Sequence, residues 1–317
     1  MKKIINKHTI AYMLVLVVAT LSLGGCSKQS EANEVVEVDV EKTSSQTTRS
    51  NEIVCLEPVP LGTNVLNAPN LVIDVSNASE GYFYLIYSGD NEDVKMQISC
   101  DGSITYTYKI GIGDTVIPLT LGSGTYSIVV YESMGNSQYS SLFADQIDVE
   151  VTNEYGPCLY PNYYVNFTAD SQAIELGKEL AANCTCDLEV IGAVYDYVIA
   201  NISYDYEEAE TVATSYVPDI DEILDTKKGI CFDYAALMSA ILRSQRIPTR
   251  LEVGYAGDAY HAWITTYIED IGWINGMIQF DGADWTLMDP TFAANSDKKT
   301  LTEFVGDGNN YTTKYIY

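Results

Sequence analysis

Two hydrophobic patterns divide the chain. From Ile53 to about Val151, short segments alternate apolar and polar residues with a period of two, and turn residues such as Gly122 and Gly124 interrupt them. This alternation is typical of β-strands with one buried face. The segments are "GYFYLIYSG", "ITYTYKIGIG", "IPLTLGSG", "TYSIVVYES" and "FADQIDVEV". Many short strands without a helical segment predict an all-β, antiparallel sandwich of immunoglobulin-like type over residues 53–152.

The second pattern begins after Asn153 and has helical spacing. Residues 170–183 and 187–202 carry apolar residues three or four positions apart, and Asp187 is a suitable N-cap for the second of these helices. A further helix is expected from Cys231 to Arg246, where Ile247-Pro248 ends it, with strands from Thr249 onward. Residues 153–317 therefore predict an α+β domain, and the protein is expected to be multidomain.

The N-terminus has the organisation of an export signal. Residues 1–25 combine a basic start with an apolar core and end in "LGG" before Cys26. The stretch "LGGC" resembles the lipobox of bacterial lipoproteins, which implies that Cys26 is lipidated and becomes the mature N-terminus. A single membrane anchor is the alternative. Residues 26–52 are rich in Ser, Thr, Gln and Glu, which predicts a disordered stalk. Either way, an extracytoplasmic location at the cell membrane is expected.

The net charge and the cysteine content limit the kinds of partner and metal site that are expected. The formal net charge of −27 would become −30 without the first 25 residues and their three lysines, and it disfavours nucleic acid as a partner. Beyond Cys26 and Cys231, five cysteines remain, so at least one is unpaired in a monomer, and the sequence does not define their pairing. No CxxC pair is present and the chain has two histidines, so neither a zinc site nor a cofactor is expected. The oligomeric state is left open.

Cys231 is the first candidate for chemistry. It follows Gly229, which is expected to let the backbone turn sharply, and it stands at the start of a predicted helix. Unpaired N–H groups and the positive end of the helix dipole gather there and stabilise a thiolate. The alternative is a small buried hydrophobe, which free cysteine often is.

The small number of histidines favours the interpretation of Cys231 as a nucleophile. His8 lies in the signal, so His261 is the only histidine of the mature protein, and in "YHAWITTYI" it shares a strand face with Trp263. Thirty residues separate it from Cys231, enough for a helix and a strand to bring a general base to the thiol. In "DWTLMDPTF", Asp289 is placed to orient the imidazole.

These motifs resemble a known family. "NISYDY", "KKGICFDYAALMSAILRSQRIPTRLEVGYAG", "HAW" and "WTLMDPTF" are similar, in order and spacing, to the core of the transglutaminase-like superfamily, over about residues 187–294. The resemblance implies a papain-like fold with Cys231 as nucleophile, His261 as base and later acid, and Asp289 as orienter. It also implies attack on a peptide or protein carboxamide, a thioester intermediate, and an oxyanion held partly by the Cys231 N–H.

Several alternatives stay open at this point. Hydrolysis, as in a cysteine peptidase, is favoured by analogy over protein cross-linking, and a non-catalytic binding or scaffold module is the competing class. Tyr204 and Tyr216 are weak candidates for a second oxyanion donor. Trp263 and Trp285 are expected to pack rather than to line the site. The segment 268–284 is longer than a tight hairpin and is expected to add a strand pair or a loop, and the acidic run 219–225 is expected to be solvated.

Overall fold

The computed structural model describes residues 49–269, 272–275, 277–280, 285–288 and 311–317. The signal, the predicted stalk up to residue 48 with Cys26, and the predicted orienter Asp289 lie outside these residues. The last four residues of the predicted stalk, 49–52, are described, and Arg49 and Asn51 hydrogen-bond to the C-terminal region, so the stalk was predicted to extend too far. Within them, no helix is long and apolar enough to cross a bilayer.

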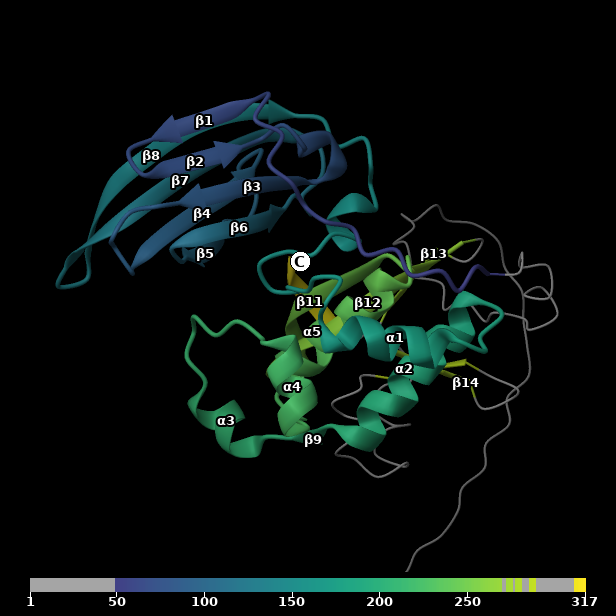
Figure 1. The fold of residues 1–317 in the computed structure, drawn as a ribbon. Helices are drawn as coiled ribbons and strands as arrows, with labels where there is room; N and C mark the ends of the chain where they lie inside the picture. Colours follow the sequence, from purple (N-terminus) through teal and green to yellow (C-terminus); the bar gives the residue numbers. More distant parts are fainter. Residues whose placement is uncertain (1–48, 270–271, 276, 281–284, 289–310) are drawn as a thin grey trace, which may run out of the picture. The chain divides into compact units, whose positions relative to one another are not determined.

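The N-terminal region consists of two antiparallel four-stranded sheets (Figure 1). One has the order β1-β2-β3-β6 and the other the order β5-β4-β7-β8. The strands are β1 (Val65–Ala68), β2 (Leu71–Asp74), β3 (Tyr82–Tyr87), β4 (Val94–Cys100), β5 (Tyr106–Ile110), β6 (Gly113–Pro118), β7 (Gly124–Gly135) and β8 (Gln138–Val149). The rings of Phe83 in β3 and Tyr126 in β7 lie 5.9 Å apart, so the two sheets meet face to face.

Alternation of side chains builds this core. In β7, Tyr126, Ile128 and Val130 are buried and their neighbours are not, as the period of two predicts. One strand prediction was misplaced. The segment "IPLTLGSG" holds the last two residues of β6 and the first residue of β7, and residues 119–123 form the turn between them, although Leu119 is buried. A buried apolar residue in a turn, here Leu119, continues the apolar–polar alternation of the preceding strand and so extends the strand prediction too far.

The C-terminal region mixes helices and strands, as predicted. Its helices are α1 (Gln172–Ala181), α2 (Asp187–Asn201), α3 (Tyr206–Thr211), α4 (Ile220–Thr226) and α5 (Cys231–Ser244). Its strands are β9 (Ser203–Tyr204), β10 (Lys228–Gly229), β11 (Thr249–Ala256), β12 (Ala259–Ile268), β13 (Gly272–Asn275), β14 (Met277–Phe280), β15 (Trp285–Met288) and β16 (Tyr311–Ile316). The main sheet has the order β13-β12-β11-β16, and β14 pairs with β15. The segment 268–284 therefore adds two strands, β13 and β14, but each pairs with a strand outside the segment rather than with the other.

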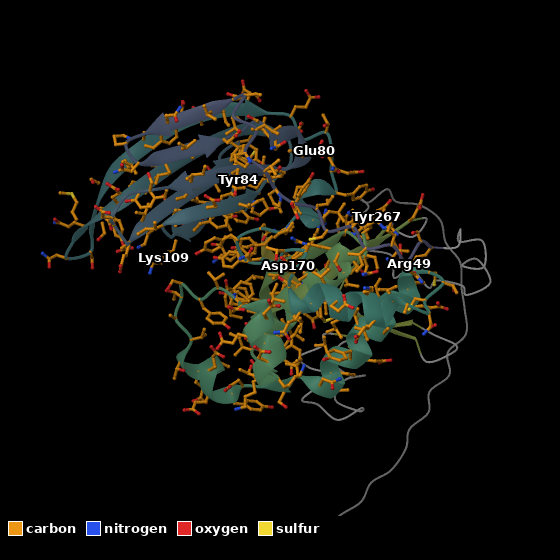
Figure 2. All side chains as sticks on the ribbon, viewed as in Figure 1. Arg49, Glu80, Tyr84, Lys109, Asp170 and Tyr267 are labelled. Carbon is orange, nitrogen blue, oxygen red and sulfur yellow. The ribbon has the colours of Figure 1, made fainter. Side chains whose placement is uncertain are left out.

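Helix α5 is the central element of this region. It packs against α1, α2 and α4 and against strands β11 and β12, and side chains surround it (Figures 1 and 2). All of its residues from Asp233 to Ser244 are buried, as expected of a helix that is covered on every side. The first residue of α5 is Cys231, so the covered helix holds this residue in a defined place.

The C-terminal end of α5 is held by Arg243, which is 1% exposed. Its guanidinium donates to the carbonyl oxygens of Thr249, Tyr160 and Tyr317, at 2.8–3.0 Å. Burial lowers the pKa of Arg243 to about 10. This side chain therefore connects α5 to the strand that follows it and to two segments that are distant in the sequence.

The start of α2 differs from the prediction. Asp187 is the first helical residue rather than the N-cap, which is Cys186 in extended conformation. The Asp187 carboxylate accepts a hydrogen bond of 3.0 Å from Nε of Arg49, the residue labelled in Figure 2, and Arg49 N also donates to Thr185 O. Arg49 lies far away in the sequence, so local pattern did not reveal this partner.

Candidate active site

Cys231 stands where the sequence predicted it, at the first position of α5. The N-cap Ile230 is extended, with φ −94° and ψ 178°, and its carbonyl accepts hydrogen bonds from the N–H groups of Asp233 and Tyr234. Cys231 is partly buried rather than fully enclosed. The N–H groups of a helix's first turn lack intrahelical acceptors and favour negative charge nearby, so this position suits a group that carries or develops one.

Asp233 holds the first turn of α5 in place. Its Oδ2 accepts a hydrogen bond of 2.7 Å from Ile230 N, which is one half of a capping box. Its Oδ1 accepts another of 2.7 Å from the hydroxyl of Tyr216, in the loop between α3 and α4. Asp233 is 1% exposed, and this burial raises the pKa of its carboxyl group to about 6. The motif Cys-x-Asp at a helix start was the signal that could have revealed this residue.

Gly229 is needed for a different reason from the one predicted. It lies in β10, parallel to Tyr204 in β9, and its φ is not in the left-handed region that glycine alone adopts readily. A Cβ at this position would lie 2.6 Å from Cβ of Asp233. Gly229 therefore makes room for the buried carboxylate rather than allowing a sharp turn.

His261 lies in β12, opposite Gly254 in β11, and is 7% exposed. Strand β12 packs against α5, which begins with Cys231. Gly254 permits the close approach of β16, because a Cβ there would lie 2.0 Å from Thr312 O. Helix α5 thus packs against β12, and β16 packs closely against the neighbouring β11, so His261 lies in a well-packed part of the sheet.

Cys231 and His261 line the same pocket, which has a volume of about 530 Å³. Tyrosine and other uncharged side chains form most of the wall. The pocket is in the size range of small-molecule and substrate sites. The structure thus brings two of the three predicted catalytic residues to one cavity, and the third, Asp289, lies outside the described residues.

Of the other aromatic residues that the sequence singled out, some line the pocket and some pack in the protein interior. Tyr204 and Tyr216 both line the pocket, but the Tyr216 hydroxyl donates to Asp233. Trp263 is 2% exposed and its ring packs 4.9 Å from that of Tyr311, which confirms that it is a packing residue. Trp285 begins β15, and its side chain is outside the described structure. Sequence reasoning missed Tyr164, Tyr260 and Tyr317 as wall residues, since they come from widely separated segments.

Beside the pocket is a shallower hollow with acidic walls. Asp205, Glu207 and Glu208 line it, and it shares Val212, Ala213 and Tyr216 with the pocket. Over the part of the chain with described coordinates, no three His, Cys, Asp or Glu side chains form a group able to hold a metal ion. The six described cysteines, including Cys231, are all free.

Residues 174–276 match the family model of the transglutaminase-like superfamily, a segment that contains both Cys231 and His261. Two sequence relatives also align. The uncharacterized protein YebA of Bacillus subtilis is 29% identical over 121 residues, which are 31% of this chain and 16% of YebA. A UPF0252 protein of Methanocaldococcus jannaschii is 27% identical over 180 residues, half of each chain. The chain thus spans half or less of the length of these relatives.

The similarity to solved structures is low. A candidate cysteine protease of Cytophaga hutchinsonii superposes with a TM-score of 0.37 at 14% identity, over 75% of this chain and 78% of that one. The periplasmic domain of TgpA from Pseudomonas aeruginosa gives 0.33 at 15% identity, over 68% and 73%. Red sea bream transglutaminase gives 0.27 at 13% identity, over 68% and 49%. Similarity at this level does not define an activity.

The sequence match therefore carries the assignment, and the helix α5 with Cys231 at its start and the strand β12 with His261 both fall inside it. Residues 174–276 belong to the transglutaminase-like superfamily.

Proposed function

We propose that the protein is a thiol-dependent acyl-transfer enzyme that acts on peptide or protein amides and releases the acyl group to water, as a cysteine peptidase or amidase does. The observation that carries the proposal is the shared pocket of Cys231, at the start of α5, and His261, in β12. A nucleophile and a base that open into one cavity are the minimum that covalent catalysis requires.

The reaction would proceed in two steps. In the first, the Cys231 sulfur attacks the carbonyl carbon of the amide and its proton passes to His261. The oxyanion that forms is stabilised partly by the Cys231 N–H, which has no intrahelical acceptor in the first turn. The C–N bond then breaks, His261 gives its proton to the leaving amine, and a thioester remains on Cys231.

In the second step, water attacks the thioester while His261 accepts its proton. Collapse of the intermediate breaks the C–S bond, and the proton returns to the sulfur, so the acid is released and the thiol restored. An amine that replaced water would produce a new amide, which is the cross-linking alternative. Asp289 is the residue we assign to orient His261.

The setting of the enzyme belongs to the same proposal. We assign Cys26 as the lipidated residue that anchors the protein outside the cytoplasm, and residues 26–48 as the stalk. We also retain the immunoglobulin-like assignment for residues 53–152, supported by two antiparallel sheets with a shared core. The strongly negative charge supports peptide rather than nucleic acid substrates.

Peptide turnover tests the proposal. The full chain, with the Cys231→Ala and His261→Ala variants, is incubated with a quenched fluorescent peptide library, with and without an added primary amine. Cleavage by the wild type that both variants lose supports the hydrolase, and amine incorporation into the acyl product supports transfer. Cys184→Ala is the control, since Cys184 is a partly buried free cysteine that does not line the pocket. No turnover of any kind in the wild type would support the scaffold alternative.

A further inference from the structure

The walls of the pocket have a distinct chemistry. Seven of the residues that line it are aromatic, and the others, apart from Cys231 and His261, are aliphatic residues and threonines. Over the described residues, no Asp, Glu, Lys or Arg contributes to the wall. The aromatic residues are Tyr164, Tyr204, Tyr216, Phe232, Tyr260, Tyr315 and Tyr317. A ligand that enters this pocket loses water without gaining an ionic partner from these walls, which favours apolar groups and disfavours charged ones.

Three rings of the aromatic wall pack closely together. The ring of Tyr164 lies 4.4 Å from that of Tyr317 and 5.1 Å from that of Phe232, the residue that follows Cys231. Tyr317 is 7% exposed. These rings pack mainly on one another, so this side of the pocket is formed before any ligand arrives and requires little reorganisation to bind one.

Two other aromatic pairs are exposed near the pocket. Tyr260, which lines the pocket, is 58% exposed and stacks edge to face on Tyr255 of the neighbouring strand at 5.5 Å. Tyr206 is 63% exposed and packs 4.9 Å from the wall residue Tyr204. Large aromatic rings left in water beside a nucleophile offer area that a bound side chain can cover.

Negative charge next to the pocket also disfavours acidic ligands. Asp205, Glu207 and Glu208 surround the adjoining hollow, which shares a wall with the pocket. We assign no ligand to that hollow. Its carboxylates repel an acidic group that approaches along the shared wall.

We propose that the pocket is a specificity site that takes a large apolar or aromatic side chain of a peptide, next to the amide that Cys231 attacks, and that it rejects acidic side chains. The inference rests on the proposed function for the attacked amide, but the binding preference itself requires no catalysis. Tyr260 is the residue assigned to contact the incoming side chain at the mouth of the pocket.

Binding to the full-length Cys231→Ala variant tests this directly. The probes are the unlabelled peptides acetyl-Gly-Xaa-Gly-Gly-amide, with Phe, Leu, Gly or Glu at Xaa, and Kd is measured by NMR titration. We expect the Phe and Leu peptides to bind roughly tenfold or more tightly than the Gly peptide. The Glu peptide should bind no better than the Gly peptide. Equal affinity for all four, or preference for Glu, overturns the inference.

Variants in the same background locate the site. Adding Tyr260→Ser should remove most of the preference for Phe over Gly, whereas Tyr260→Phe retains the ring and should preserve it. Met134→Ala, at an exposed position in the N-terminal region, should leave all four affinities unchanged. A preference for Phe that survives Tyr260→Ser unaltered contradicts the assignment of Tyr260.

The wild-type enzyme separates this inference from the proposed function. If the same peptides are cleaved, their kcat/KM values should follow the order of the affinities. If none is cleaved while the affinities keep that order, the hydrolase proposal fails and the specificity site stands.

Discussion

Tyr216 donates a hydrogen bond of 2.7 Å to Asp233, and this contact joins the loop before α4 to the first turn of α5. Asp233 also accepts from Ile230 N, directly ahead of Cys231. Both the loop and the helix start line the pocket. The position of the candidate nucleophile thus depends on a buried carboxylate.

Asp233 should make stability depend on pH. Its pKa in the folded protein is raised to about 6 from an ordinary value of 3.8. A raised pKa means that folding favours the protonated form, so the contribution to stability is full below pH 4 and is lost as pH rises through 6. The loss corresponds to about 3 kcal/mol. In urea unfolding, the stability of the wild type relative to Asp233→Asn should fall by that amount between pH 4 and pH 7.5. A difference that does not change with pH contradicts this.

Removal of the Tyr216 hydroxyl should cost more at high pH than at low pH. A hydrogen bond to an ionised acceptor contributes roughly 1.5–3 kcal/mol, and one to a neutral acceptor about 1 kcal/mol. Tyr216→Phe should therefore destabilise the protein more at pH 7.5 than at pH 4, again by urea unfolding. Tyr206→Phe, an exposed tyrosine ten residues away, is the control. An equal cost at both pH values would show that Tyr216 does not contact the ionised carboxylate.

Gly229→Ala should displace the start of α5. The new Cβ would lie 2.6 Å from Cβ of Asp233, which cannot move without its helix, so we expect a loss of about 1–3 kcal/mol in unfolding free energy. Slower alkylation of Cys231 should accompany it. Gly192→Ala in α2 is a matched control, since nothing lies within 4 Å of its new Cβ, and it should stabilise by up to about 1 kcal/mol. Equal effects of the two changes would refute the steric role of Gly229.

Arg243→Ala should destabilise the C-terminal region strongly. It would leave the carbonyls of Thr249, Tyr160 and Tyr317 without this donor and remove a fully buried side chain. The expected cost is about 3 kcal/mol or more in chemical unfolding. Arg246→Ala is the comparison, because Arg246 is exposed, and it should cost about 1 kcal/mol or less. Similar costs at the two positions would mean that Arg243 does not hold these segments together.

The local sequence pattern predicted the elements that carry the site, but not the contacts between them. The start of α5 at Cys231 and the strand that holds His261 follow from apolar periodicity and from Pro248. The Tyr216–Asp233 bond spans 17 residues and a loop, where periodicity carries no information. Arg49 reaches Asp187 across 138 residues, a contact that local pattern does not reveal. The predicted N-cap was wrong by one residue, because an acid suits both the N-cap and the first turn of a helix.

The pocket wall was unpredictable for the same reason. Tyr164, Tyr260 and Tyr317 come from three separate segments, and each alone is an ordinary strand or loop tyrosine. In the strand-rich region, Leu119 is buried although it lies in the turn after β6. Because a buried residue need not be in a strand, the apolar alternation predicted a strand where the structure has a turn. Long-range packing, rather than local preference, determines these features.

Lipidation of Cys26 can be tested apart from catalysis. In a bacterial host that modifies lipoproteins, the wild type should incorporate labelled palmitate and sediment with membranes. Cys26→Ser should lose the label, because the thioether that carries the lipid cannot form. Retention of the label in Cys26→Ser, or its absence from the wild type, would contradict the anchor.

The most direct test of the central claim, that His261 activates Cys231, is the rate of iodoacetamide alkylation of Cys231 against pH, measured by peptide mass spectrometry. A model thiol slows about tenfold for each pH unit below its pKa of about 8.5. If His261 activates Cys231, the wild-type thiol should keep most of its alkylation rate between pH 8 and pH 6. His261→Ala should lose this advantage, while the alkylation of Cys184 in the same samples should not change. Alkylation of Cys231 that follows the model thiol and is indifferent to His261→Ala would contradict this claim.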